Sequence, residues 1–243
     1  TTTSGGTATT AMTIDASQNT TLVGSLNAPN TFGFKNRIIN GGCMVTQYGS
    51  VSVAANTAKT YGGCDRIALG TFSFSTISGT LAQAGYAGSG SSATGFVQQF
   101  GPVTTTGSGS ISFFQRIEAS NVSDLNGKAI TITVALYQDT GSTLSPTINI
   151  YKANALNDFS ATTFVNGQAV SLTSGTRTTF TFTATLGSSD ATNGLEVRVN
   201  FAVGAVTGKY FQISDMQLEK GSIATGLDFR SIGTELALCQ RYY

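Results

Sequence analysis

The feature that most constrains this chain is an alternation of apolar and polar residues, repeated in several segments with almost no helical periodicity. In residues 195–203, Leu, Val and Phe occupy every second position, with Glu196, Arg198 and Asn200 between them. Residues 130–136 alternate in the same way. Because successive side chains of a β-strand point to opposite faces, each segment predicts a strand with one face in a core and the other in water.

Further strands are predicted at residues 72–74, 111–117, 148–150 and 180–182. Phe72 and Phe74 are expected to share one face. Turns are predicted at three Asn-Gly pairs, residues 126–127, 166–167 and 193–194, since both residue types accept a positive φ. One short helix is expected over residues 234–243, with Thr234 as its cap. Strands in succession without intervening helices favour an all-β, antiparallel β-sandwich.

Two segments differ from this pattern. Residues 1–31 are rich in Thr and weakly hydrophobic, and such a stretch buries too little apolar surface to form its own core. We expect a shaft-like or linker β segment there, and a β-sandwich domain over residues 32–243. Residues 79–95 are rich in Gly, Ser and Ala and predict a long exposed loop. The chain opens with neither Met nor a signal sequence, so we expect it to be part of a longer polypeptide.

The charge and cysteine content exclude several classes of partner. Only 10% of residues are charged, and the 13 basic residues are scattered singly, which argues against DNA or RNA as a ligand. No apolar run has the length of a membrane span, so membrane insertion is not expected. Three cysteines form no disulfide framework. Reduced, packed thiols are expected, with pairing of Cys43 and Cys64 left open and Cys239 unmatched.

The search for catalytic chemistry gives little. The chain has no His, which excludes a Ser-His-Asp triad, and it has no paired Cys spacing for a structural zinc. The suggestive carboxylate pairs are Asp215 with Glu219, and Glu118 with Asp124. Positions four apart on a strand are separated by about 13 Å, too far for either glycosidase geometry. We therefore expect surface carboxylates and no enzyme.

Metal and cofactor chemistry is weakly supported. Asp139 and Asp190 lie in predicted loops, where carboxylates and carbonyl oxygens could hold a structural Ca²⁺. No Asp-rich ligand spacing accompanies them, which favours a turn-stabilising role for both. No cofactor is predicted, and a structural Ca²⁺ remains an open alternative without support from spacing.

Sugar recognition without catalysis needs aromatic ring faces next to polar groups. The chain has 15 Phe, which fall mostly in alternating strands and belong to a core, and 8 Tyr. Tyr48, Tyr61 and Tyr86 instead flank Gly-rich turns. They are the candidate ligand contacts, against the simpler interpretation that each packs incidentally.

Several stretches resemble a family of bacteriophage and prophage tail-fibre, or virion-appendage, proteins. They are FGFKNRIINGG at 32–42 leading to Gln47, YGGCDR at 61–66, LNGKAITI at 125–132 and ISDMQLEKGSIAT at 213–225, closing with ELALCQRYY at 235–243. Residues 11–17 (AMTIDAS) are also similar to a repeat of phage fibre shafts. Two positions depart from the family pattern, because Ile67 replaces a Trp and Tyr48 replaces a basic residue.

This resemblance covers residues 32–243 and implies a jelly-roll sandwich similar to galactose-binding and carbohydrate-binding modules. It also implies a virion protein assembled in the bacterial host cytoplasm, a homotrimer, and other virion proteins as partners. The shared motifs read as structural: Asp65-Arg66 is expected to form a buried or edge ion pair. The strand holding 217–219 is expected to lie near the segment that opens at residue 32.

Three hypotheses for function follow. The first is a tail-fibre domain that binds a host cell-surface glycan or other receptor. The alternative is a structural virion component, such as a capsid decoration, head fibre or fibre-attachment domain, without a host ligand. A polysaccharide depolymerase is ranked last.

Overall fold

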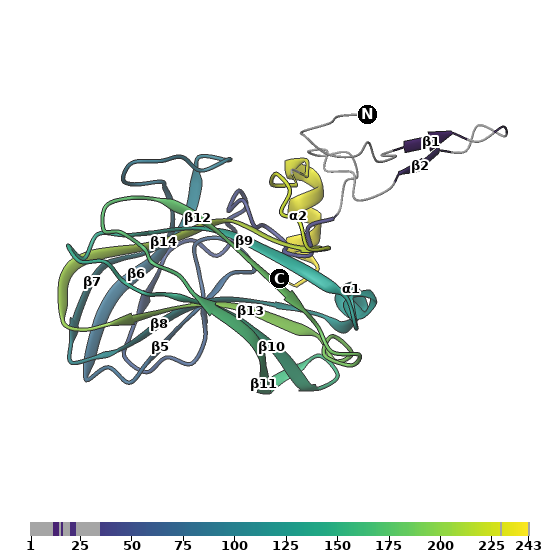
Figure 1. The fold of residues 1–243 in the computed structure, drawn as a ribbon. Helices are drawn as coiled ribbons and strands as arrows, with labels where there is room; N and C mark the ends of the chain where they lie inside the picture. Colours follow the sequence, from purple (N-terminus) through teal and green to yellow (C-terminus); the bar gives the residue numbers. More distant parts are fainter. Residues whose placement is uncertain (1–11, 15, 17–19, 23–34, 229, 243) are drawn as a thin grey trace.

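The protein folds as two antiparallel six-stranded sheets packed face to face, a jelly-roll β-sandwich, as predicted (Figure 1). The computed structural model describes residues 12–14, 16, 20–22, 35–228 and 230–242. Sheet I has the order β11 (Asp158–Ala169), β10 (Thr147–Ala155), β13 (Leu195–Val203), β8 (Gly109–Ile117), β5 (Ala68–Phe72), β4 (Thr60–Tyr61). Sheet II has the order β12 (Thr178–Thr185), β9 (Ala129–Gln138), β14 (Val206–Lys220), β7 (Phe96–Thr106), β6 (Thr76–Gly85), β3 (Val51–Val53).

Short elements complete the description. A helix α1 (Ala119–Val122) and a 3₁₀ turn η1 (Ser123–Leu125) join β8 to β9, and a helix α2 (Ile232–Gln240) follows the last strand. Strands β1 (Met12–Ile14) and β2 (Thr20–Leu22) pair with each other in an antiparallel hairpin. Most of the predicted segment 1–31 lies outside the described residues, so the division at residue 31 stays a prediction.

The inward faces of the two sheets form one core. Phe113 of β8 and Phe201 of β13 meet edge to face with ring centroids 6.1 Å apart. Phe201 in turn meets Phe211 of β14 at 5.4 Å, which joins sheet I to sheet II. All three rings are fully buried. The alternation that predicted β13 and β9 therefore identifies their core faces correctly.

Other local predictions were wrong. Strand β5 ends at Phe72, because Ser73 has a φ of 65° and turns the chain. As a result Phe74 enters the core, while Phe72 lies on the outer side of sheet I and the two do not share a face. The pair Asn166-Gly167 lies inside β11 and makes no turn. The pairs at 126–127 and 193–194 do turn, with positive φ at both glycines.

The prediction of a loop over residues 79–95 was wrong for its first part, because residues 79–85 belong to strand β6. Leu81 is fully buried in the core. A Cβ atom at Gly79 would approach the Phe100 ring to 2.7 Å, so the small residue there serves close packing within the sheet. Only residues 86–95 form the connection between β6 and β7.

Helix α2 begins at Ile232, and its cap is Ser231 where Thr234 was predicted. The Ser231 side chain accepts a hydrogen bond from the Thr234 backbone N–H at 3.4 Å, as an N-cap residue does for the third helical position. Cys239 on this helix packs with Ile39 and Val45 in a small second cluster. Helix α2 therefore holds the segment around residue 40 against the sandwich.

That opening segment lies beside β14, as predicted. The Arg37 backbone N–H donates to the Leu218 carbonyl at 2.8 Å. The Asn36 amide donates to the Met216 carbonyl at 3.0 Å and accepts from the Leu218 N–H at 3.1 Å. Buried Asn36 thus replaces a missing strand partner for the end of β14.

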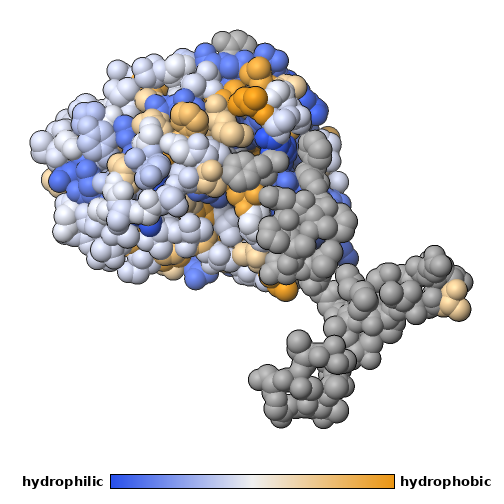
Figure 2. Space-filling model, turned by 90° about the horizontal axis from the view of Figure 1, so that it is seen from above, coloured by the Kyte–Doolittle hydropathy of each residue, from blue (hydrophilic) through white to orange (hydrophobic). Residues whose placement is uncertain are grey.

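The three cysteines are buried and have free thiols in this structure, and their reduced state in the protein stays a prediction. Weakly polar residues cover much of the sandwich surface visible in Figure 2, in keeping with a chain in which only 10% of residues are charged. Among the helices described, none has the length and apolar character needed to cross a membrane.

Candidate functional site

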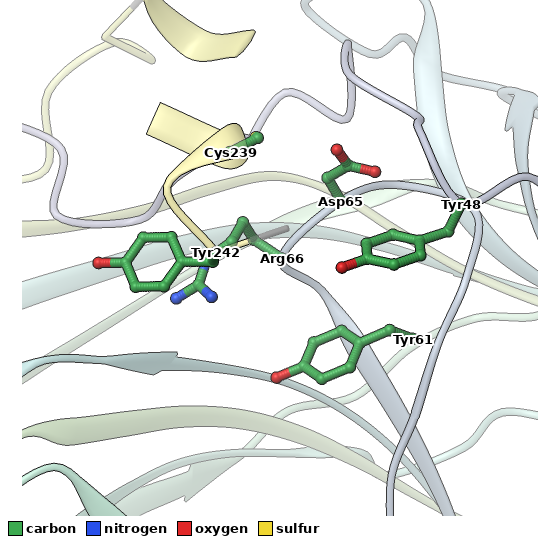
Figure 3. Close-up of a pocket in the computed structure, with 6 residues that line it drawn as sticks. All are labelled: Tyr48, Tyr61, Asp65, Arg66, Cys239 and Tyr242. Carbon is green, nitrogen blue, oxygen red and sulfur yellow. The ribbon is translucent and has the colours of Figure 1, made fainter. Parts of the chain in front are cut away.

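A pocket of about 170 Å³ forms where the loop before β3, strand β4 and the end of α2 meet (Figure 3). We call it the tyrosine pocket; its lining residues are Tyr48, Tyr61, Asp65, Arg66, Cys239 and Tyr242. It contains two of the three tyrosines that the sequence predicted as ligand contacts.

Tyr48 and Tyr61 stack, with ring centroids 6.5 Å apart and an interplanar angle of 26°. Both hydroxyl groups point toward the side of the pocket where Arg66 and Tyr242 lie (Figure 3). Lys59 Nζ lies 5.2 Å from the Tyr61 ring centroid. The pair therefore offers apolar ring surface with hydroxyl groups at its rim, a combination suited to a sugar ring.

Three glycines allow the two tyrosines to approach each other. The Gly63 N–H donates to the Gly49 carbonyl at 2.6 Å, which ties the Tyr48 loop to the end of β4. A Cβ atom at Gly62 would lie 2.4 Å from a Val51 methyl group, so no larger residue fits this approach. Gly63 has a φ of 64°, a conformation that favours glycine.

Arg66 and Tyr242 form the opposite wall. The Arg66 guanidinium carbon lies 3.5 Å from the Tyr242 ring centroid, which is a cation–π contact. Arg66 Nη2 also donates to the Arg116 carbonyl at 3.0 Å. The Tyr242 hydroxyl donates to Glu118 Oε2 at 2.9 Å. Burial raises the pKa of Tyr242, and the bond to Glu118 raises it further, so the phenol is neutral at physiological pH.

The expected ion pair of Asp65 and Arg66 was wrong. The buried Asp65 carboxylate accepts hydrogen bonds from the Gln47 backbone N–H at 2.8 Å and from the Gln47 side-chain amide. Arg66 turns to the Tyr242 ring instead. In the part of the chain that the structure describes, neither residue makes an ion pair. Asp65 thus holds the Tyr48 loop through Gln47.

Cys239 contributes a neutral thiol to the pocket. Burial raises its pKa to about 12, with further contributions from the charges of Asp65 and Glu235. The thiolate is the reactive form of cysteine. A thiol with this pKa is therefore a packing group at neutral pH.

We expect native protein to react with iodoacetamide at Cys239 about a thousandfold more slowly at pH 8 than unfolded protein, because the thiolate fraction falls with the raised pKa. Labelling followed by peptide mass spectrometry measures both rates, with urea-unfolded protein as the control. Equal rates in the two states would show that Cys239 is an accessible nucleophile.

The third predicted contact, Tyr86, is not among the pocket's lining residues. It lies at the start of the loop between β6 and β7 and is exposed. Arg66 and Tyr242 were missed as lining residues. Both fall in motifs of the sequence resemblance, but no local signal places Tyr242 beside Tyr48, since nearly the whole chain separates them.

The suggestive carboxylates are each held by separate structural contacts. Asp215 accepts hydrogen bonds from the Ala93 N–H at 3.1 Å and from the Ser92 hydroxyl, and Glu219 accepts from the Thr225 N–H at 2.9 Å. Burial raises the pKa of Asp215. The sequence predicted no catalytic pair here, and each carboxylate fastens a different loop to β14.

Glu118 and Asp124 also have separate partners. Glu118 accepts from Tyr242 and pairs with Arg241 at 3.3 Å. Asp124 pairs with Arg37 at 2.9 Å and with Lys220 at 3.5 Å. Glu118 therefore holds the residues that follow α2, and Asp124 holds Arg37 and the last residue of β14.

Asp190 takes the turn-stabilising role expected for it, whereas Asp139 bonds across to the backbone of β14. Asp139 accepts from the Tyr210 N–H at 2.7 Å. Asp190 accepts from the Gly187 N–H at 2.7 Å and from Lys152 Nζ at 2.8 Å. Within the described residues, no three Cys, Asp or Glu side chains converge as a metal site would require.

Comparisons with known proteins give fold likeness only. No protein-family model matches the chain, and no curated protein matches it. A solved family 4 carbohydrate-binding module is 17% identical with a TM-score of 0.41, over 75% of this chain and 98% of that one. The family 22 xylan-binding domain of Paenibacillus barcinonensis Xyn10C is 11% identical with a TM-score of 0.38, over 73% and 99%.

A phage protein is also among the solved structures with this likeness. The enzymatically active domain of bacteriophage CBA120 tailspike protein 4 is 13% identical with a TM-score of 0.35, and the match spans 77% of this chain and 22% of that one. At these identities the likeness concerns the arrangement of strands.

Proposed function

We propose that this chain is a non-catalytic glycan-binding module. The observation that carries the proposal is the stacking of Tyr48 on Tyr61 at the mouth of a pocket whose far wall is Arg66 and Tyr242. Its volume of about 170 Å³ is below the ~300–1,000 Å³ typical of sites for drug-sized ligands. The pocket therefore suits a single sugar ring or the end of a glycan chain.

The non-catalytic part of the proposal is supported by how the carboxylates are used. Asp215 and Glu219 each fasten a loop to β14, and Asp65 holds the Tyr48 loop through Gln47. A glycoside hydrolase needs two carboxyl groups facing one scissile bond. Carboxylates committed to separate structural hydrogen bonds favour recognition over hydrolysis.

The proposal that the module belongs to a virion is supported by the sequence resemblance to tail-fibre proteins. We propose a tail-fibre domain on a virion that binds a glycan of the host cell surface, as a homotrimer. Three weak sites displayed together raise the overall affinity without any new contact. The mass of the purified protein in solution tests the trimer directly.

Replacement of Tyr48 or Tyr61 by alanine is expected to weaken glycan binding about tenfold or more, because an aromatic anchor of a small site carries ~2 kcal/mol. Polysaccharide extracted from host cell surfaces and titrated into the protein by calorimetry measures the affinity. Tyr86→Ala is the matched control, since Tyr86 is 45% exposed and Tyr48 is 46% exposed.

Thermal unfolding of all three variants checks that they remain folded. Binding lost in Tyr48→Ala and Tyr61→Ala but kept in Tyr86→Ala supports the proposal. Binding lost only in Tyr86→Ala would move the site to the loop 86–95. No binding by the wild-type protein would overturn the glycan-binding role and favour a structural virion component.

A further inference from the structure

The outer side of sheet I carries a second group of polar and aromatic side chains, none of which lines the tyrosine pocket. We call it the open sheet face; it is built from Phe72, Ser112, Asn149, Tyr151, Arg198 and Asn200, which line a groove of about 230 Å³. These residues come from β5, β8, β10 and β13. No helix of the described chain covers the middle of this face (Figure 1).

The strand register places these residues in cross-strand rows. Tyr151 of β10 pairs with Glu196 of β13, which pairs with Arg116 of β8. In the next row Asn149 pairs with Arg198. In the row beyond, Asn200 pairs with Ser112. Because residues in register on neighbouring strands share a face, the polar residues of these rows lie on one face. In the middle row the β8 partner of Arg198 is the buried ring of Phe114.

A buried charge cluster lies in the first of these rows. Glu196 is fully buried, and its two oxygens accept from Arg116 Nε at 2.9 Å and from Arg198 Nε at 2.8 Å. The arginine side chains remain 25% and 23% exposed. A buried carboxylate is costly unless it is fully paired, so this cluster fixes both guanidinium groups in place at the surface.

Two arginines surround one glutamate within the cluster, and the carboxylate of Asp158 on the neighbouring β11 interacts electrostatically with Arg116. Arg116 and Arg198 account for two of only 13 basic residues in the chain. Among the described residues, no hydrogen bond involves either Nη of Arg116, so those donors are directed to solvent or to a ligand. Arg198 donates both Nε and Nη2 to Glu196, which leaves its Nη1 for a ligand. The two Nη groups of Arg116 can recognise a carboxylate through paired N–H donors.

Aromatic rings support the two guanidinium groups. The Arg198 guanidinium lies 4.3 Å from the Tyr151 ring centroid, and that of Arg116 lies 5.4 Å from the Phe114 centroid. Tyr151 itself meets Phe164 edge to face at 5.6 Å. The Arg116 guanidinium also lies 5.3 Å from the Phe159 centroid, so cation–π contacts hold both guanidinium groups against aromatic rings.

Neutral polar groups line the rest of the groove. The Ser112 hydroxyl donates to Asn200 Oδ1 at 2.8 Å, and Asn149 Nδ2 donates to the Thr147 hydroxyl at 3.0 Å. In the described chain the Asn200 NH₂ group and the Asn149 carbonyl oxygen have no hydrogen-bond partner. One donor and one acceptor are thus available beside the arginines for sugar hydroxyl groups.

We propose that the open sheet face binds an extended acidic polysaccharide, with Arg198 in the groove and Arg116 beside it pairing with a sugar carboxylate, and with Asn149 and Asn200 bonding to hydroxyl groups. This goes beyond the proposed function, because it is a second binding surface that shares no lining residue with the tyrosine pocket. It also names the ligand class as a uronate-containing chain.

The test uses polygalacturonate as the probe and methyl-esterified polygalacturonate as the matched neutral polymer, in affinity gel electrophoresis. Wild-type protein is expected to be retarded by the acid polymer and not by the ester, and the retardation is expected to fall as salt rises. Equal retardation by both polymers, or none by the acid polymer, would overturn the proposal.

Two variants assign the site. Arg198→Gln is expected to weaken binding of the acid polymer about tenfold or more, as the loss of a charge-assisted hydrogen bond does. Its matched control is Arg37→Gln, since Arg37 is also ion-paired and 28% exposed but lies away from the groove.

Asn200→Asp covers the case in which Arg198→Gln fails to fold. This change keeps the acceptor for Ser112 and adds a negative charge inside the groove. It is expected to abolish binding of the acid polymer while leaving thermal stability close to wild type. Unchanged binding in Asn200→Asp would sink the proposal. Tyr48→Ala should bind the acid polymer normally, so failure of the tyrosine pocket and failure of this face can be told apart.

Discussion

Asn40→Ala is expected to lower the free energy of unfolding by about 3 kcal/mol or more. The Asn40 side chain donates to the carbonyls of Val45 at 2.8 Å and Asp65 at 3.0 Å, and it accepts from the Val45 N–H at 2.9 Å. All of these groups are buried, and each one left without a partner costs about 1–3 kcal/mol. Asn40 also has a φ of 57°, which alanine accepts less readily.

Urea unfolding followed by circular dichroism measures this loss. Asn166→Ala is the control, because exposed Asn166 makes only a local hydrogen bond to the next N–H and should change stability by less than about 0.5 kcal/mol. If Asn40→Ala lowered the free energy of unfolding as little as the control does, the Asn40 side-chain hydrogen bonds would not have the stabilising role given to them here. Because Asp65 lines the tyrosine pocket, the variant should also weaken glycan binding.

The motifs of the family resemblance are explained by such contacts. Asn36 pairs with β14, Asn40 joins Val45 to Asp65, and Glu235 accepts from the Asn40 N–H. These residues come from the two ends of the described sandwich, and together they hold the opening segment and α2 on it. The expectation that the shared motifs are architectural is consistent with this arrangement.

The alternation in the sequence predicted the long strands because it reports which face of a strand is apolar. It fails where one residue turns the chain, as at Ser73, and where small residues fill a strand for packing reasons, as at Gly79. It also does not report exposure. Glu196 alternates as an outward residue, yet it is fully buried, because Arg116 and Arg198 cover it.

The candidate site was predictable only in part. Tyr48 and Tyr61 could be chosen because nearby glycines allow two loops to approach closely, and this local signal is visible in the sequence. Tyr242 and Arg66 complete the pocket through a long-range contact that no spacing reveals. The open sheet face depends on strand register, which the alternation of a single strand does not determine.

Arg230→Met is expected to destabilise the protein by about 3–5 kcal/mol, because it leaves a buried carboxylate without its cation. The Arg230 and Glu235 side chains are only 6% and 5% exposed, and Arg230 Nη1 lies 3.1 Å from Glu235 Oε1. The same Nη1 also donates to the Ile38 carbonyl at 3.1 Å. The variant therefore loosens α2 and the opening segment together, and urea unfolding measures the change.

The double variant Arg230→Met, Glu235→Leu separates the cost of an unpaired charge from the value of the pair. Replacing both ions of a buried pair by apolar side chains is often close to neutral, whereas removing one is not. The double variant should therefore recover at least about half of the loss seen in Arg230→Met. A double variant no more stable than the single one would show that the hydrogen bonds of these two side chains to the backbone, from Arg230 to the Ile38 carbonyl and from the Asn40 N–H to Glu235, and not the ion pair, hold α2 in place.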